Sequence, residues 1–287
     1  VYHDKIEKVI RIKKMSERYD HKIIGKIDLH LPFNTNLRGT IKNSDLTISK
    51  VRGTIAINTE STDSDLNNLN GNINITTRGG NISATKLSGE MELTVVSGDI
   101  NIFDCDANSM LTMDNGNIFI NGLKGNLLSN TTLGETLVSN YEGESSVFNI
   151  NVGNLKINKS KSNINATIDI GSVNINNIQG TTTIFTGKGE INLNNIIGDV
   201  NCNTNFGNVN GINLFGKINA NSELGDIEIN KGYNSFLKDH SVNIATKRGS
   251  ISVRLPSDLP YAINSQCHNL ETRNAISSEI PLDEEFL

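Results

Sequence analysis

A glycine that recurs every nine residues constrains this chain of 287 residues more than any other feature of its sequence. One residue is inserted between Gly143 and Gly153, and three positions that lack glycine hold Thr62, Ala107 and Ser162. A fixed internal period is the signature of a repeat architecture, in which copies of one small unit stack on each other. The recurring glycines are Gly53, Gly71, Gly80, Gly89, Gly98, Gly116, Gly125, Gly134, Gly143, Gly153, Gly171, Gly180, Gly189, Gly198, Gly207, Gly216 and Gly225.

Each nine-residue unit reads as a turn followed by a short strand. Gly71 precedes Asn72, Ile73, Asn74 and Ile75, and most other units repeat this alternation of polar and apolar residues. Alternation with a period of two indicates a strand with one buried face. Glycine followed by Asn or Asp is typical of turns, because glycine accepts a positive φ without steric cost. Helices are therefore not expected in the repeat region.

Two unlike units alternate, so the complete repeat is an 18-residue coil made of two nine-residue half-turns. In every second unit, an apolar or aromatic residue such as Leu69 or Tyr141 stands two places before the glycine, whereas the other units are more polar there. The sequence predicts an all-β fold, a single parallel β-solenoid (β-helix) of about ten coils, on the order of 50 Å long. We expect two inward columns: Ile73, Met91, Leu127 and Ile164 in one, and Ile82, Ile100, Ile118, Leu155, Val173, Ile191, Val209 and Ile227 in the other.

The periodicity divides the chain into three parts. Residues 51–231 form the regular solenoid, and residues 1–50 are interpreted as a β-rich N-terminal cap, because an open solenoid end would expose an unpaired strand edge. Residues 232–287 are expected to hold an insertion of about six residues, a closing coil around Gly249, and a C-terminal cap and tail. The insertion contains Tyr233 and Phe236.

The closing segment, Thr246-Lys247-Arg248-Gly249-Ser250-Ile251-Ser252-Val253-Arg254-Leu255-Pro256, resembles that of a bacterial adhesin-domain family with eukaryotic relatives of unknown function. The segment Asp28-Leu29-His30-Leu31-Pro32 resembles the opening strand of the same family. The similarity covers most of residues 25–265. It implies a right-handed solenoid without known catalytic residues, and an adhesin-like role.

Composition excludes several classes of function. The net charge of −5 and a pI near 5.6 argue against nucleic-acid binding, which needs clustered Lys and Arg. No run of about 18 apolar residues is present, so no transmembrane segment is expected in this chain. The first residues, Val1 to Lys5, lack a signal-peptide profile and no Met precedes them, so the sequence makes no prediction of compartment.

No residue combination predicts a catalytic, cofactor or metal site. Calcium-binding nonapeptide repeats need Gly-Gly-x-Gly-x-Asp, and this chain carries mostly one glycine per unit. Asp104 and Asp106 lie close together, but two acids in a turn are expected to be solvated only. The three cysteines form no CxxC pair and are interpreted as buried thiols. These cysteines are Cys105, Cys202 and Cys267, and the histidines, expected at the surface or in the caps, are His3, His21, His30, His240 and His268.

The favoured function is therefore a non-enzymatic scaffold or adhesin-like binding module that presents a flat polar face to a protein or glycan partner. The alternative is a carbohydrate-active β-helix enzyme whose carboxylates the sequence does not reveal. Self-association through the solenoid ends is a third possibility. Phe103 and Phe119 fall on adjacent coils, where they are either partly buried at turns or part of a contact patch.

Overall fold

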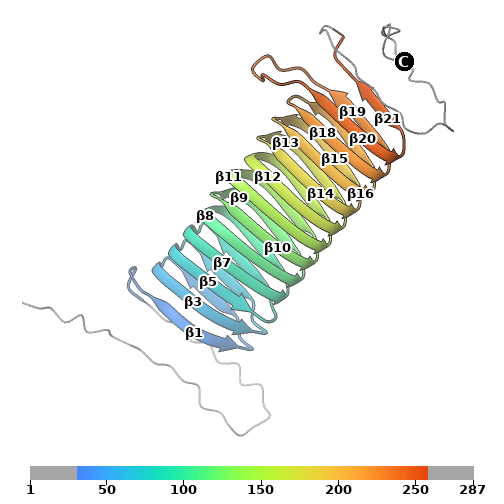
Figure 1. Ribbon diagram of the computed structural model, residues 1–287. Coiled ribbons are helices and arrows are strands. Elements are labelled where there is room, and N and C mark those ends of the chain that lie inside the picture. Colours follow the sequence, from blue (N-terminus) through green and yellow to red (C-terminus); the bar gives the residue numbers. More distant parts are fainter. Residues whose placement is uncertain (1–30, 258–287) are drawn as a thin grey trace, which may run out of the picture.

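The structure is a computed structural model that describes residues 31–257, and within this range every strand pairing is parallel and no helix is present. The chain winds into an elongated solenoid of about 11 turns (Figure 1). Each turn contributes one strand to each of two sheets, which we call sheet 1 and sheet 2. The long strands β8 (Ile100–Asn115), β11 (Thr136–Val152) and β12 (Leu155–Ile170) bend around a corner and belong to both sheets.

The remaining strands alternate between the sheets along the chain. Sheet 1 also contains β1 (Leu37–Lys42), β3 (Arg52–Glu60), β5 (Asn70–Thr77), β7 (Ser88–Ser97), β10 (Leu127–Leu133), β14 (Thr182–Lys188), β16 (Val200–Phe206), β18 (Ile218–Leu224) and β20 (Val242–Arg248). Sheet 2 also contains β2 (Leu46–Ser49), β4 (Ser64–Asn67), β6 (Ile82–Thr85), β9 (Ile118–Lys124), β13 (Val173–Gln179), β15 (Ile191–Ile197), β17 (Val209–Leu214), β19 (Ile227–Lys231) and β21 (Ile251–Arg254).

The predicted 18-residue register is confirmed. Ile73 lies opposite Met91 in sheet 1, and Ile100 lies opposite Ile118 in sheet 2. Every residue of the two predicted inward columns is at most 3% exposed. A single coil has no interior of its own, so the apolar area that stabilises the fold is buried only by stacking.

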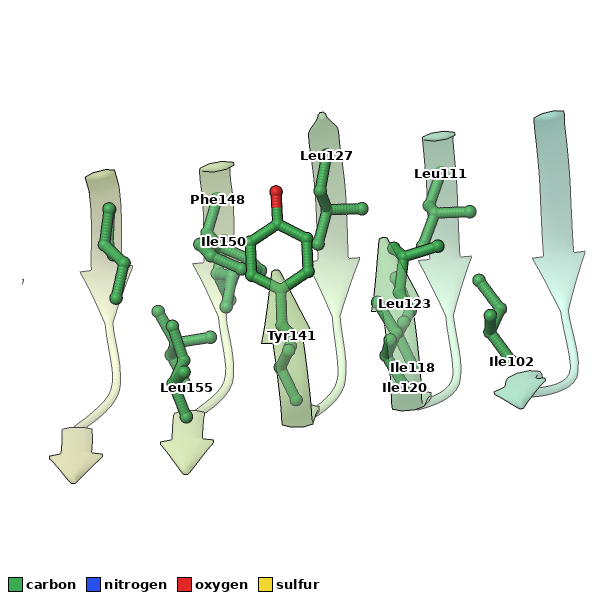
Figure 2. Packing of buried hydrophobic residues seen from close by; sticks show 14 of the residues in the cluster. Ile102, Leu111, Ile118, Ile120, Leu123, Leu127, Tyr141, Phe148, Ile150 and Leu155 are labelled. Atoms are coloured by element: carbon green, nitrogen blue, oxygen red, sulfur yellow. The ribbon is translucent and has the colours of Figure 1, made fainter. Parts of the chain in front are cut away.

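The inserted residue of the periodic series appears as a β-bulge in β11. Across it the spacing between paired strands lengthens by one residue, as in the pairing of Thr136 with Leu155, and the register shifts between Glu142 and Ser145. Tyr141 fills the core beside this bulge, where Figure 2 shows its ring among apolar side chains. Its hydroxyl lies 2.8 Å from the carbonyl oxygen of Gly125 and 2.9 Å from that of Ser145, so the buried O–H has a hydrogen-bond acceptor.

The solenoid register continues on both sides of residues 51–231. On the N-terminal side, β1 and β2 already pair with β3 and β4 at 18-residue spacing, within the segment expected as a cap. On the C-terminal side, Ile218 pairs with Val242, and this spacing exceeds the regular one by the expected six-residue insertion. Residues 1–30 and 258–287, which hold the rest of the expected caps, lie outside the described residues.

Two different corners join the sheets. At the first corner, from sheet 1 to sheet 2, glycines such as Gly98 and Gly134 have φ near 140°. At the second corner, from sheet 2 to sheet 1, the residue three places before the glycine is left-handed. One of these left-handed residues is Gly122. The others have side chains and φ between 50° and 58°: Lys50, Asn68, Lys86, Asp104, Asn140, Lys159, Asn177, Asn195 and Asn213.

Candidate functional site

The outer faces of both sheets carry ladders of asparagine side chains. In sheet 1, Asn219 donates from Nδ2 to Oδ1 of Asn201 at 2.7 Å, and Asn243 donates to Asn219 at 2.9 Å. In sheet 2, Asn210 donates to Asn192 at 2.9 Å. Amides are thus stacked from coil to coil, as is common where strands repeat in register. Each amide still has an N–H and a lone pair that the ladder does not use, so the faces remain able to bind polar groups.

A second set of polar side chains holds the turns together. At the first corner, Oδ1 of Asn117 accepts the backbone N–H of Glu135 at 3.0 Å, and Asp99 accepts that of Asn117 at 2.8 Å. At the second corner, Asn163 accepts the N–H of Thr181 in the same way. This bond explains why Asn or Asp so often follows the glycine, because each side chain binds the turn of the next coil. These residues have a structural role.

The strongest candidate for a binding site is a shallow groove of about 660 Å³ on the outer face of sheet 1, beside the second corner. It runs along the solenoid axis, because its lining repeats from one coil to the next. One wall consists of the residues that follow the second-corner glycines or, in one coil, Ala107: Asn72, Glu90, Asn108 and Asn126. The other wall consists of the outward residues two places further on, Asn74, Glu92, Met110, Leu128 and Val147.

The chemical character of the groove changes along its length. Near the N-terminal end the groove is polar and acidic: Asn74 donates to Glu92 at 2.6 Å, and Asn108 donates to Glu90 at 3.0 Å. Further along, the outward residues become apolar, and Met110 is 43% exposed. The groove therefore offers fixed hydrogen-bond acceptors and a strip of aliphatic surface in one continuous line.

Other residues considered from the sequence do not assemble into a site. Asp104 takes the left-handed position of its turn, and both Asp104 and Asp106 are exposed, as expected for solvated acids. His240 lies in the insertion, with its ring 4.9 Å from that of Tyr233. The other four histidines, His3, His21, His30 and His268, lie outside the described residues.

The cysteines are buried where the structure describes them. Cys105 and Cys202 are 2% and 1% exposed, which confirms their interpretation as buried thiols. Burial raises the pKa of Cys105 above its ordinary value and that of Cys202 to about 12, because a thiolate would lose its hydration. Cys267 lies outside the described residues.

Phe103 and Phe119 contact each other on the outer face of sheet 2. Their ring centroids are 5.5 Å apart and both side chains are partly buried. Phe119 lies between Asn101 of the preceding coil and Leu137 of the next coil, and Phe103 lies opposite Asn121. Both rings are thus partly buried and lie on the outer surface of adjacent coils, and their role as a contact patch stays a prediction.

Sequence reasoning did not find the groove. Its outward residues, such as Glu92 and Met110, are paired one coil apart in the register, which was the available signal.

No group of three or more His, Cys, Asp or Glu that could bind a metal occurs within residues 31–257. Comparisons with models of protein families, with curated proteins and with solved structures find no match. Among the described residues, no helix has the length and apolar character needed to cross a membrane.

Proposed function

We propose that the protein is a non-enzymatic, adhesin-like binding module that holds an extended glycan along the groove of sheet 1. The observation that carries this proposal is that equivalent wall positions recur in each coil, about 4.8 Å apart, which suits a ligand that is itself an extended repeating chain. Sugar hydroxyls can donate to Glu90, Glu92 and the asparagine amides. The apolar faces of sugar rings can pack on Met110 and Leu128.

The backbone in the groove favours a glycan over an extended peptide. The strands below it, β5, β7, β8 and β10, are each hydrogen-bonded to neighbours on both sides. Peptides that bind sheets by strand addition need an unpaired edge, and the groove has none. A glycan needs only the side chains. The resemblance of the closing segment to the adhesin-domain family also favours a binding role.

The charge of the groove narrows the class of glycan. Glu90 and Glu92 would repel a polyanion, so we expect neutral or amino-sugar polymers to bind and heparin or alginate to bind far less. The test is binding of the full chain to an immobilised panel that includes chitosan, β-glucans, galactomannan, heparin and alginate. We expect Met110→Arg to weaken binding about ten-fold or more, because it blocks the aliphatic strip.

Ile212→Arg is the matched control, since Ile212 is 52% exposed on the outer face of sheet 2, away from the groove. Equal weakening by both variants, or binding of the polyanions alone, would contradict the proposal.

A second candidate, a carbohydrate-active enzyme, is favoured by one observation. Glu90 and Glu92 are two residues apart on one strand and both line the groove. Their Cα atoms are therefore about 6.6 Å apart, a spacing from which two side chains could bring their carboxyl groups to the separations used by glycoside hydrolases. Both side chains are exposed, however, whereas a general acid needs a less hydrated site. Release of reducing ends from a bound polymer, abolished by Glu90→Gln or Glu92→Gln, would favour the enzyme.

A further inference from the structure

A row of exposed apolar side chains runs along the first corner, away from the groove. In five of six successive coils, the residue directly before the turn glycine is large and apolar. Leu133 lies opposite Val152 in the parallel register, and Val152 opposite Ile170. Lys188 interrupts the row once. We call these residues the apolar row: Leu133, Val152, Ile170, Phe206 and Leu224, which are between 38% and 52% exposed.

The fold does not require this row. In the preceding coils the same position is occupied by Ser97 and Asn115, which pair in the same register and form the same turn. Single exposed apolar residues are common on soluble proteins, but larger exposed apolar patches mark interaction surfaces. On the two sides of Lys188 the row is contiguous, from Leu133 to Ile170 and from Phe206 to Leu224. With coils about 4.8 Å apart, the apolar row is about 24 Å long.

Acidic side chains flank the apolar row. Over these six coils, counting one residue before and two after each position of the row and of Lys188, there are five acids and one base, Lys188. Lys247 and Arg248 of the next coil lie beside Glu223 and Leu224, so the local charge with them included is 3 − 5 = −2. Glu223 contacts Lys247 of the next coil, and the other acids have no ion pair within residues 31–257. The five acids are Glu135, Asp169, Glu190, Glu223 and Asp226.

This charge distribution selects between possible occupants. A second copy that placed its row against the first would bring two acidic rims together, which costs free energy. An anionic lipid surface would be repelled for the same reason. A partner with an apolar stripe and Lys or Arg beside it would be complementary in both respects.

We propose that the apolar row is a docking surface for a cationic amphipathic helix of a partner protein. The spacing supports a helix that lies along the solenoid axis, because one helical turn rises about 5.4 Å, close to the coil spacing. Side chains on one face of a strand repeat at about 6.6 Å and would fall out of step with the row. About 16 helical residues span the row. This surface is separate from the groove, so the inference does not depend on the glycan proposal.

The test uses two fluorescent 18-residue helical peptides, titrated against the full chain and read by anisotropy. Both peptides carry leucines at i, i+3, i+4 and i+7; one has lysines beside this stripe and the other has glutamates. We expect the lysine peptide to bind at micromolar concentrations and the glutamate peptide to bind at least ten-fold more weakly. Phe206→Ser should weaken binding of the lysine peptide about ten-fold.

Ile212→Ser is the control for a generic loss of apolar surface, because Ile212 is equally exposed but lies off the row. Glu190→Lys tests the charge and should reduce the preference for the lysine peptide. Three results would overturn the proposal: equal binding of both peptides, equal effects of Phe206→Ser and Ile212→Ser, or a concentration-dependent dimer that Phe206→Ser dissociates. Vesicles containing phosphatidylserine should not bind; binding that Phe206→Ser abolishes would assign the row to a membrane instead.

Discussion

Gly134 is one of the glycines at the first corner, where its φ of 146° places the backbone in a region that residues with a Cβ rarely adopt. A Cβ atom at this position would lie 1.7 Å from the carbonyl oxygen of Gly116, the equivalent glycine one coil before. The glycines at this corner are therefore stacked so closely that each leaves no space for a side chain on the next.

Gly134→Ala is expected to destabilise the solenoid by about 3 kcal/mol or more, because it adds both backbone strain and a collision with a backbone atom. Gly39→Ala is the control, since nothing lies within 4 Å of the Cβ that it would add. The midpoint of unfolding in urea should fall clearly for the first variant and stay nearly unchanged for the second. Similar midpoints for both variants would contradict the close stacking of the corner.

The buried thiols lead to a chemical prediction. Because the pKa of Cys202 is raised to about 12, almost no thiolate is present at pH 8, and the side chain is also shielded from reagents. Iodoacetamide at pH 8 should leave Cys202 and Cys105 unmodified in the folded protein and modify both in urea, as read by mass spectrometry of the peptides. Native modification of Cys202 at the rate found in urea would show that the core opens readily.

At the scale of elements, β19 ends in an unusual way. Lys231 occupies the inward column position that Leu214 fills one coil earlier, and it is 4% exposed. After Lys231 the chain leaves the coil for the insertion. The Nζ atom donates to the carbonyl oxygens of Phe215, at 2.9 Å, and of Gly216. The amine thus satisfies carbonyl groups of the preceding turn at the place where the regular coil is interrupted.

Burial lowers the pKa of Lys231 from 10.5 to about 8, although the charges of Asp199 and Asp239 counter part of this effect. The unfolded chain then binds more protons than the folded chain between these two values. The stability contributed by this group is greatest above pH 10.5 and is lost as the pH falls through about 8.

Lys231→Met removes this proton linkage. Relative to the variant, the wild-type protein should gain up to about 3 kcal/mol of unfolding free energy between pH 8 and 10.5, measured by urea unfolding. Groups that titrate in both proteins cancel in the comparison. Parallel pH profiles would mean that the amine has an ordinary pKa in the folded state.

At the scale of the whole molecule, the architecture could be predicted from the sequence because each turn requires glycine or another small residue at a fixed position. Each glycine such as Gly98 marks a corner within its own nine residues, and the 18-residue register follows from alternating two kinds of corner. The bulge near Tyr141 and the insertion after Lys231 were also visible as breaks in the period.

The candidate surfaces were not predicted, for a physical reason. Outward residues such as Glu92, Met110 and Ile170 have no packing requirement, so their chemical type does not follow from the fold. Their role depends on neighbours that are one coil away in the sequence but adjacent across the sheet. The left-handed positions at the second corner were missed as well. Asn occupies five of them and tolerates this conformation, which was the available signal, whereas lysines such as Lys86 and Lys159 are not typical turn residues.

The stacking of equivalent coils gives a prediction about deletions. Removing residues 173–190, one complete 18-residue unit, joins Ser172 to Ile191 and leaves every column intact, because Ser172 and Glu190 occupy equivalent positions before Val173 and Ile191. Removing residues 173–181 joins unlike corners and should prevent proper stacking. Circular dichroism and small-angle X-ray scattering should show a folded rod about 5 Å shorter for the first deletion only. Equal folding of both variants would contradict the 18-residue unit.

The same register has a consequence for inheritance. A coil contacts only the coils on either side of it, so an in-frame duplication of one unit adds a turn, and the other coils need not repack. Duplication or loss of one 18-residue unit could therefore lengthen or shorten this rod in whole steps. The reach of the molecule becomes a trait that can vary among descendants while its cross-section stays constant.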